Sequence, residues 1–525
     1  MDVHFRNGHE LLIGKSCMRN EQYYLGIELG STRIKAVAIG EDFSPVAAGD
    51  YTWSSSYENG VWTYPLEEVW TGLRAALAPL KERKIASMGI SGMMHGYLAF
   101  DKDWNLLVPF RTWQNTITGP AAAELTALFG FNIPQRWSIA HLYQAILNGE
   151  EHVSRIAHIT TLAGYVHYRL TGVNAVGIGE ASGMFPVDSE TGTYRAEMLD
   201  KLEALLAPRG YPWKLRELLP KVLRAGTLAG ALTGEGAALL GGRLPPGIPF
   251  CPPEGDAGTG MVATNSVAPR TGHVSAGTSI FSMVVLEKPL EQVYEEIDLV
   301  ATPAGAPVAM VHCNNCTTDI NAWAGILKET AQLFAAAPGT GELYTKLYEK
   351  SLEGDPDCGG VLVYNNLAGE GVTHLDEGRP MVLRRAESHF TLANFLRAQL
   401  YSTMATLKLG MDILTSERVA IDSLTGHGGL FKTPVVGQRY LAAVCNAPVT
   451  CMETAGEGGP YGMALLALYL FYGEEPLEQF LERQVFREAK KTTITPVLED
   501  VAGFHVYMER YKAGLQVERS AIEHI

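Results

Sequence analysis

The 525-residue chain has few cysteines, no long apolar run and no cluster of basic residues, and each shortage excludes a class of protein. Seven cysteines are too few for a disulfide scaffold of this length, and no second CxxC completes a zinc site with Cys313 and Cys316. We therefore expect structural cysteines in a reducing, cytoplasmic compartment. No stretch reaches ~18 apolar residues, and residues 1–22 lack the apolar core of a secretory signal.

The charge balance excludes two further kinds of partner. The chain has 42 Lys and Arg against 57 Asp and Glu, which gives a net charge of −15. No long basic run could neutralise a nucleic-acid backbone or an anionic bilayer, so we expect neither as a partner.

The length exceeds what one hydrophobic core supports, which predicts two or more domains with a cleft between them.

Two segments far apart share one pattern, in which a glycine and two hydroxyl residues lie between apolar strands. The first turn is Gly30-Ser31-Thr32, between strands predicted at 23–29 and 33–40, and the second is Gly277-Thr278-Ser279, between strands at 271–276 and 280–286. Alternating apolar residues around such turns predict β-hairpins. The recurrence predicts two domains on one plan. We place an N-terminal extension at 1–22, a first domain at 23–272, and a second domain with a helical tail at 273–525.

These turns are candidate phosphate sites. Glycine lets an anion approach closely, and the backbone N–H and hydroxyl groups can donate to it. One such turn is common in sheets, but two in separate domains could clasp a polyphosphate from both sides. A strand follows each turn, whereas a helix follows a Walker A loop or a dinucleotide fingerprint, and the chain has neither motif in clean form. A dehydrogenase with a dinucleotide site is therefore disfavoured.

The rest of the chain alternates between predicted helices and strands, which indicates an α/β fold. We expect helices at 66–80, 392–414 and 463–472, strands at 84–91, 106–110 and 420–425, and a helical tail from Pro496. Glycine clusters occur at the end of the last strand and before the helix at 463. Ligands bind at such strand ends in open α/β sheets, so we take as nucleotide-binding candidates Gly426, Gly428, Gly429 and, in the second cluster at 456–462, Gly459.

Asp256 lies in a glycine-rich segment just before the apolar run at 261–263. As an N-cap, its carboxylate would satisfy free N–H groups without any further function. As a general base, it would accept the proton of a hydroxyl that attacks phosphorus. The local sequence leaves both interpretations open.

Two polar segments follow predicted strands and could bind a polyhydroxylated ligand. Side chains that donate and accept hydrogen bonds beside an indole face suit such a ligand, and the candidates are Met94, His95, Trp113 and Gln114. The alternative for His95 is a loop histidine with satisfied hydrogen bonds, and for Trp113 a core aromatic residue.

Seven motifs in order carry a resemblance to a known family: GIELGSTRIK, SGMMHG, FRTWQNT, EGDAGTGM, VSAGTSIF, TGHGGLFKTP and GEGGPYGMALLALYL. From about Tyr24 to about Tyr511 the chain resembles the FGGY carbohydrate kinases, which include xylulokinase, ribulokinase and glycerol kinase. The resemblance implies two ribonuclease-H-like domains of the actin, hexokinase and heat-shock ATPase superfamily, closing around ATP and Mg²⁺.

The resemblance assigns roles to the candidates. It implies a first phosphate loop at 30–32, a second at 277–279, and an adenosine motif at Gly426, Gly428 and Gly429 with Gly459 beside the nucleotide. It makes Asp256 the catalytic base, adds Glu28 and Asp256 as Mg²⁺ residues, and places at the sugar Met94, His95, Trp113, Gln114 and Asp256. Three positions depart from the family's usual Asp: Glu28, Asn115 and Glu180.

The implied function is transfer of the γ-phosphoryl group of ATP to a sugar hydroxyl. The Met-His-Gly motif favours a ketopentose such as xylulose or ribulose, and a homodimer is common among relatives. The alternative is a nucleotide-binding regulator or chaperone-like ATPase on the same fold. Such a protein would have no reason to carry the sugar motif at Met94, His95 and Trp113.

Overall fold

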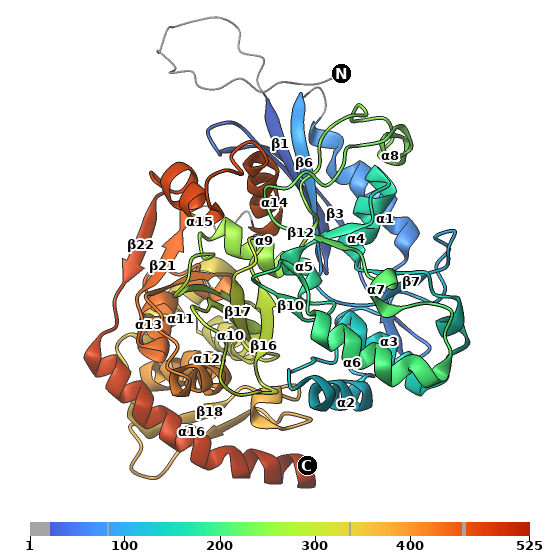
Figure 1. Ribbon diagram of the computed structural model, residues 1–525. Coiled ribbons are helices and arrows are strands. Elements are labelled where there is room, and N and C mark those ends of the chain that lie inside the picture. The colour runs from blue at the N-terminus through green and yellow to red at the C-terminus, as the bar shows by residue number, and fades with distance from the viewer. Residues whose placement is uncertain (1–21, 81–82, 335–337, 454–457) are drawn as a thin grey trace, which may run out of the picture.

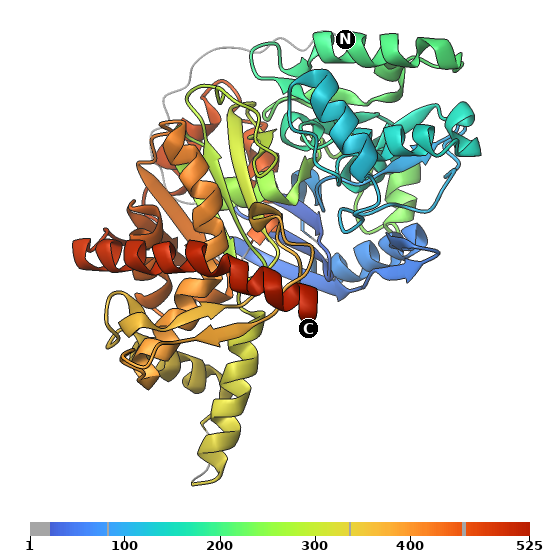
Figure 2. The same cartoon turned by 90° about the horizontal axis from the view of Figure 1, so that it is seen from below.

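The computed structural model describes residues 22–80, 83–334, 338–453 and 458–525. Residues 1–21 of the predicted N-terminal extension lie outside the described residues, as do Gly456 and Glu457 of the second glycine cluster. The described chain forms two large mixed sheets with helices and short two-stranded sheets around them (Figure 1). Seen from below, the blue and teal first half lies on one side of the molecule and the orange and red segments on the other (Figure 2).

The first sheet has five strands in the order β13-β6-β1-β2-β3. β1 pairs antiparallel with β2 and parallel with β6, so the predicted hairpin around the turn at 30–32 is confirmed. The strand bounds are β1 Tyr23–Leu29, β2 Arg33–Ile39, β3 Pro45–Thr52, β6 Ile85–Gly92 and β13 Glu254–Gly255.

The second sheet repeats this plan and adds strands at each edge, in the order β16-β17-β15-β14-β20-β21-β22. β14 pairs antiparallel with β15 and parallel with β20, as β1 does with β2 and β6, so the second predicted hairpin is also present. The bounds are β14 Thr271–Ala276, β15 Ile280–Val285, β16 Asp298–Ala301, β17 Pro307–Cys313, β20 Ser423–His427, β21 Val449–Met452 and β22 Lys491–Ile494.

One helix from late in the sequence completes the core of the first sheet. α14 (Gly458–Tyr469) packs on β1, β2 and β6 and on α9 (Asp256–Ala263), and Figure 1 shows it beside β1. A Cβ on Gly26 would lie 2.0 Å from the carbonyl oxygen of Pro460, so glycine is required for this approach. The N-terminal end of α14 is thereby held near the end of β1.

The main helices besides α9 and α14 surround both sheets, and three shorter ones are α7 Leu215–Leu218, α8 Gly234–Leu239 and α15 Leu477–Phe480. The first half contains α1 Leu66–Ala76, α2 Gly119–Phe129, α3 Ser138–Leu147, α4 Leu162–Thr171, α5 Ile178–Ala181 and α6 Ala196–Leu206. The second half contains α10 Thr318–Gln332, α11 Thr340–Ser351, α12 Leu392–Ser416, α13 Val436–Cys445 and α16 Leu498–His524. Within the described residues, no helix combines the length and the hydrophobicity needed to cross a membrane.

Cys313 and Cys316, the CxxC pair of the sequence, are buried in the hydrophobic core around the second sheet. Cys313 and Cys316 lie among apolar residues packed beneath α12, with 0% and 1% of their surface exposed. Burial raises the pKa of the Cys316 thiol to about 12, which disfavours the thiolate that metal binding or redox chemistry needs. Their surroundings therefore suit a structural role.

The prediction of a strand at 106–110 is wrong. Leu106 forms a single bridge with Phe100, and the segment otherwise lacks regular structure as far as Arg111. Pro109 has no N–H to donate to a ladder, which explains why the apolar run does not extend β7 (Leu98–Phe100).

Candidate active site

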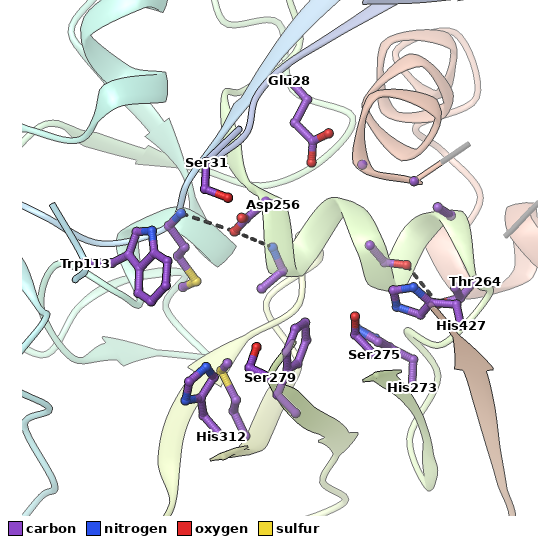
Figure 3. Close-up of a pocket in the computed structure, with 18 of the residues that line it drawn as sticks. Glu28, Ser31, Trp113, Asp256, Thr264, His273, Ser275, Ser279, His312 and His427 are labelled. Atoms are coloured by element: carbon purple, nitrogen blue, oxygen red, sulfur yellow. Dashed lines mark hydrogen bonds between the residues drawn. The ribbon is translucent and has the colours of Figure 1, made fainter. Parts of the chain in front are cut away.

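A cavity of about 390 Å³ is lined by residues from both halves of the chain. Its walls come from β1, β2 and the segment after β6 on one side, and from β14, β15 and β17 on the other, with α9 between them. Figure 3 shows Asp256 between Ser31 on one side and Ser279 on the other. The two predicted turns therefore contribute side chains to one space.

Asp256 is the first residue of α9, and Gly255 occupies the N-cap position. Its Oδ1 accepts hydrogen bonds from the backbone N–H of Met94 at 3.2 Å and of Ala257 at 2.9 Å (dashed in Figure 3). Asp256 is therefore not the N-cap residue, which is the preceding Gly255. Its carboxylate nevertheless accepts a hydrogen bond from one N–H of the first turn, that of Ala257. Burial raises the pKa of Asp256, and the two N–H groups oppose that rise.

The first turn has its carbonyl oxygens occupied by other groups. Trp53 Nε1 donates to the Gly30 carbonyl at 2.7 Å, Tyr64 donates its hydroxyl to the Ser31 carbonyl at 2.7 Å, and Trp53 N donates to the Thr32 carbonyl at 3.1 Å. Ser31 lines the cavity. Because these hydrogen bonds occupy the three carbonyl oxygens of the turn, the turn suits an anion rather than a cation.

The second turn is held in a similar way. The Gly277 carbonyl accepts hydrogen bonds from Thr317 N at 3.1 Å and Thr317 Oγ1 at 2.7 Å. Ser275 and Ser279 line the cavity on this side. Parallel pairing of β14 with β20 places Ser275 opposite His427, so the predicted adenosine motif lies beside the second turn.

Glu28 lies where the end of β1 meets α14. Its register partner on β2 is Lys35, and both side chains line the cavity. Burial, followed by the charge of Asp256, raises the pKa of Glu28 to about 7, while Lys35 acts in the opposite direction. A Cβ on Gly459 would lie 2.3 Å from Glu28 Oε1, so a glycine at the start of α14 makes room for this carboxylate.

The two carboxylates fit a magnesium ion bound together with phosphate. Mg²⁺ usually takes one or two carboxylates and completes its shell with water and phosphate oxygens. Glu28 and Asp256 offer hard oxygen donors in the same cavity. Over the described ranges, no group of three or more His, Cys, Asp or Glu side chains is arranged to hold a metal alone.

The other end of the cavity contains the predicted sugar residues. His95 has a positive φ of 73°, and its ring stacks on Trp137. Its Nδ1 lies 3.3 Å from the Gly183 carbonyl, an acceptor, so Nδ1 carries the proton and Nε2 can accept. Burial, with the charge of Arg136, lowers the pKa of His95 well below its ordinary value, which keeps the imidazole neutral. Met94 and Trp113 line the same end.

Comparison with known proteins identifies the chain. The models of the N-terminal and C-terminal domains of the FGGY family of carbohydrate kinases match residues 23–263 and 272–471. The chain belongs to the FGGY family of carbohydrate kinases.

Its relatives extend over nearly the full length. The chain is 24% identical to the xylulose kinase of Haemophilus influenzae over 514 residues, which cover 93% of this chain and 98% of the relative. Among solved structures, a xyloylose kinase from Brucella ovis matches with a TM-score of 0.76 at 21% identity, and a gluconate kinase from Lactobacillus acidophilus with 0.78 at 18% identity. Each structural match covers 94% of this chain and 98% of the other.

This FGGY kinase therefore has the two-domain α/β fold of the actin and hexokinase type, and it is a sugar kinase. Kinases of the family use ATP as the phosphoryl donor. Sugar and ATP fit as its small-molecule partners. The regulator or chaperone-like alternative is not favoured by these relatives.

The structure gathers about half of the predicted site residues of the FGGY kinase around the cavity. The predicted residues that line it are Glu28, Ser31, Met94, His95, Trp113, Asp256, Ser279 and Gly459. The predicted residues outside its lining are Gly30, Thr32, Gln114, Gly277, Thr278, Gly426, Gly428 and Gly429. All of the second set, Gln114 included, lies within two residues of a lining residue in the same motif, so these positions adjoin the cavity wall.

Besides Glu28, for whose longer side chain Gly459 leaves room, Asn115 is the departure from the family pattern whose side chain has a structural role. The amide of Asn115 accepts a hydrogen bond from Trp62 N at 2.8 Å and donates to the Trp62 carbonyl at 2.9 Å, so it fastens two loops together. Glu180 is fully buried, and its backbone N–H donates to Glu254 Oε2 at 2.8 Å. Burial raises the pKa of both carboxyl groups, that of Glu254 to about 8.

Several lining residues were not identified from the sequence as part of the site. Lys35 and His427 stand inside two of the seven motifs, and His273 lies in the strand predicted at 271–276, but no function was assigned to them. His312, next to Cys313, lines the cavity from β17, and no role was predicted for it. Arg136 lies in no motif, and the sequence carries no signal for it.

Proposed function

We propose that this kinase phosphorylates a ketopentose such as xylulose or ribulose, with Asp256 as the catalytic base. The supporting observation is the position of Asp256, which is bonded to Met94 N of the Met-His-Gly motif and lies between two turns with occupied carbonyls. The names of relatives such as the xylulose kinase of Haemophilus influenzae favour a ketopentose.

The two turns hold the phosphates of ATP in this proposal. Donors of the turns at 30–32 and 277–279 bind the β- and γ-phosphates, and the adenosine lies against Gly426, Gly428, Gly429 and Gly459. Lys35, which lines the same cavity as Ser31, adds a positive charge. Hydrogen bonds that are already in place need no reorganisation as charge develops on the transferred group.

The sugar binds against Met94, His95, Trp113 and Gln114. Its reacting hydroxyl faces the Asp256 carboxylate, which takes the proton as the O–H bond breaks. The hydroxyl oxygen forms a new bond to the γ-phosphorus, and the bond to the bridging oxygen breaks, so ADP leaves with that electron pair. Approach of the two halves excludes water and limits hydrolysis of ATP.

Glu28 and Asp256 would hold Mg²⁺, directly or through water. When bound, the ion supplies positive charge against the β- and γ-phosphates. Burial and then the charge of Asp256 raise the pKa of Glu28, and Lys35 opposes this rise. The longer Glu28 side chain, where relatives usually have Asp, reaches the cavity because Gly459 leaves room for it.

The domain division is part of the proposal. Residues 23–272 would bind mainly the sugar and residues 273–525 mainly the nucleotide, although α14 packs on the first sheet.

We also propose a homodimer in the cytoplasm. Size-exclusion chromatography with light scattering tests the assembly, and a monomer at micromolar concentration would contradict it.

A coupled ADP-release assay across ketopentoses, ketohexoses, deoxyketoses, polyols and sugar acids tests the substrate. We expect the largest kcat/KM for xylulose or ribulose. A clear preference for another class would replace the ketopentose, and background rates with every compound would contradict the proposed substrate range.

A further inference from the structure

A loop of the first half, residues 130–137 between α2 and α3, reaches the edge of the second sheet. Asn132 Nδ2 donates to the Ile297 carbonyl at 3.0 Å, and Arg136 Nη2 donates to Asp298 Oδ2 on β16. Asp298 exposes 7% of its surface. A partly buried ion pair, with 22% of the Arg136 side chain exposed, therefore joins the two halves of the molecule.

Arg136 also lines the cavity at the end that contains the predicted sugar residues. Its charge contributes, after burial, to the lowered pKa of both His95 and His312, so the guanidinium lies within electrostatic reach of the two imidazoles. Of the three guanidinium nitrogens of Arg136, Nη2 donates the hydrogen bond to Asp298. Within the part of the chain that the structure describes, Nε and Nη1 have no hydrogen-bond partner.

The backbone fixes Arg136 beside the Met-His-Gly motif. Gly96 N donates to the Arg136 carbonyl at 3.0 Å, and Ser138 Oγ donates to the Gly96 carbonyl at 2.6 Å. Because Asp298 restrains the guanidinium and Gly96 restrains the main chain, the free N–H groups are already oriented before a ligand arrives.

We propose that Arg136 is a sugar-binding residue whose Nε and Nη1 donate to an oxygen of a neutral sugar, and that Asp298 is its positioning residue. This deepens, and rests on, the proposed function. Asp298 neutralises the guanidinium, so the site offers directed N–H donors without a net positive charge. Such a site favours hydroxyl or carbonyl oxygens over the carboxylate of a sugar acid.

The pair also makes sugar binding depend on both halves of the molecule. The donor comes from the loop before α3, whereas the carboxylate that orients it comes from β16. A bound sugar therefore contacts the first half directly and the second half through Arg136.

Steady-state kinetics of three variants test the proposal. We expect Arg136→Met to raise the KM for the sugar about 10- to 100-fold while the KM for ATP stays within twofold. Asp298→Asn leaves the guanidinium charged and unpaired, so the ratio of kcat/KM for an aldonic acid to that for the neutral ketose should rise at least fivefold. Arg270→Met removes a comparable Arg–Asp pair on the surface, with Asp422, and should change neither value.

Each result decides between the alternatives. An unchanged sugar KM in Arg136→Met, or equal rises in the KM for sugar and ATP, would overturn the role of Arg136. An unchanged preference ratio in Asp298→Asn would overturn the positioning role. If Arg136→Met fails to fold in thermal unfolding, Arg136→Lys decides, since it keeps the charge but loses the planar fork and should still raise the sugar KM at least fivefold. A wild-type enzyme without ketose activity contradicts the proposed substrate instead, and a wild-type preference for sugar acids overturns the inference.

Discussion

The backbone N–H of Met94 donates a 3.2 Å hydrogen bond to Oδ1 of Asp256, and this bond joins the sugar motif to the carboxylate at the start of α9. The donor follows β6 and the acceptor follows β13, two parallel neighbours of the first sheet. Residues about 160 positions apart thus meet at the carboxyl ends of adjacent strands, where open α/β sheets bind ligands.

Asp256→Asn tests the catalytic base. The amide oxygen of Asn can accept the same two N–H bonds, so the backbone geometry should persist, but the side chain can no longer take a proton. We expect kcat to fall about 10²-fold or more. Calorimetry should show ATP binding within threefold of the wild type, and turnover near the wild-type rate would contradict the role. Asp422→Asn, in an exposed ion pair, serves as the control.

Gly459→Ala tests the packing of Glu28 against α14. The new Cβ would lie 2.3 Å from Glu28 Oε1 and would displace the carboxylate from the cavity wall. We expect kcat/KM for ATP to fall at least tenfold. Glu28→Asp in the Gly459→Ala background should recover part of this loss because the shorter side chain leaves room for the methyl group.

The glycine variants have a matched control in Gly325→Ala, on α10, where an added Cβ meets nothing within 4 Å. Its kinetics should equal those of the wild type. Strict additivity of the Glu28 and Gly459 effects would show that the two positions do not interact.

The anchors of the two turns provide a third prediction. Tyr64→Phe removes the hydroxyl that donates to the Ser31 carbonyl, and Thr317→Val removes the hydroxyl that donates to the Gly277 carbonyl. Each lost bond is worth about 1 kcal/mol, so the KM for ATP should rise about fivefold in each variant. The KM for the sugar should not change, and Tyr57→Phe, at an exposed tyrosine, should change neither constant. A rise confined to the sugar KM would contradict the phosphate role of the turns.

Local pattern was sufficient for the hairpins and for much of the site. The alternating apolar residues around Gly30 and Gly277 specify antiparallel pairing within a few residues, so neither turn required tertiary information. Ser31, Ser279 and Asp256 could be found for the same reason, because each lies inside a short motif that has its own chemistry.

Other parts of the site depend on contacts that no local pattern encodes. Ser275 lies opposite His427 only because β14 pairs with β20, some 150 residues later in the chain. α14 packs on the first sheet although it belongs to the second half of the sequence. Arg136 reaches the cavity through a loop whose position is fixed by Gly96 and Asp298, so its role becomes visible only in three dimensions.

His141 gives a prediction about stability that is independent of the active site. Its ring is fully buried on α3 and stacks on Tyr97, and within the described residues neither ring nitrogen has a hydrogen-bond partner. Burial, followed by the nearby charge of Arg111, lowers its pKa to about 3. The folded protein therefore binds fewer protons here than the unfolded chain does, and stability is lost as the pH falls from about 6.5 toward 3.

At pH 4 this single histidine should cost the wild type about 3 kcal/mol of unfolding free energy relative to pH 7. His141→Phe keeps the ring stacked on Tyr97 but has no group to protonate, so urea unfolding should show a smaller loss by that amount. At pH 7 the variant should match or exceed the stability of the wild type, because an apolar ring replaces two unpaired polar atoms. His505→Phe, at an exposed position on α16, should leave the pH dependence as it is in the wild type. Parallel pH profiles for the wild type and His141→Phe would show that the imidazole is solvated or paired in the folded state.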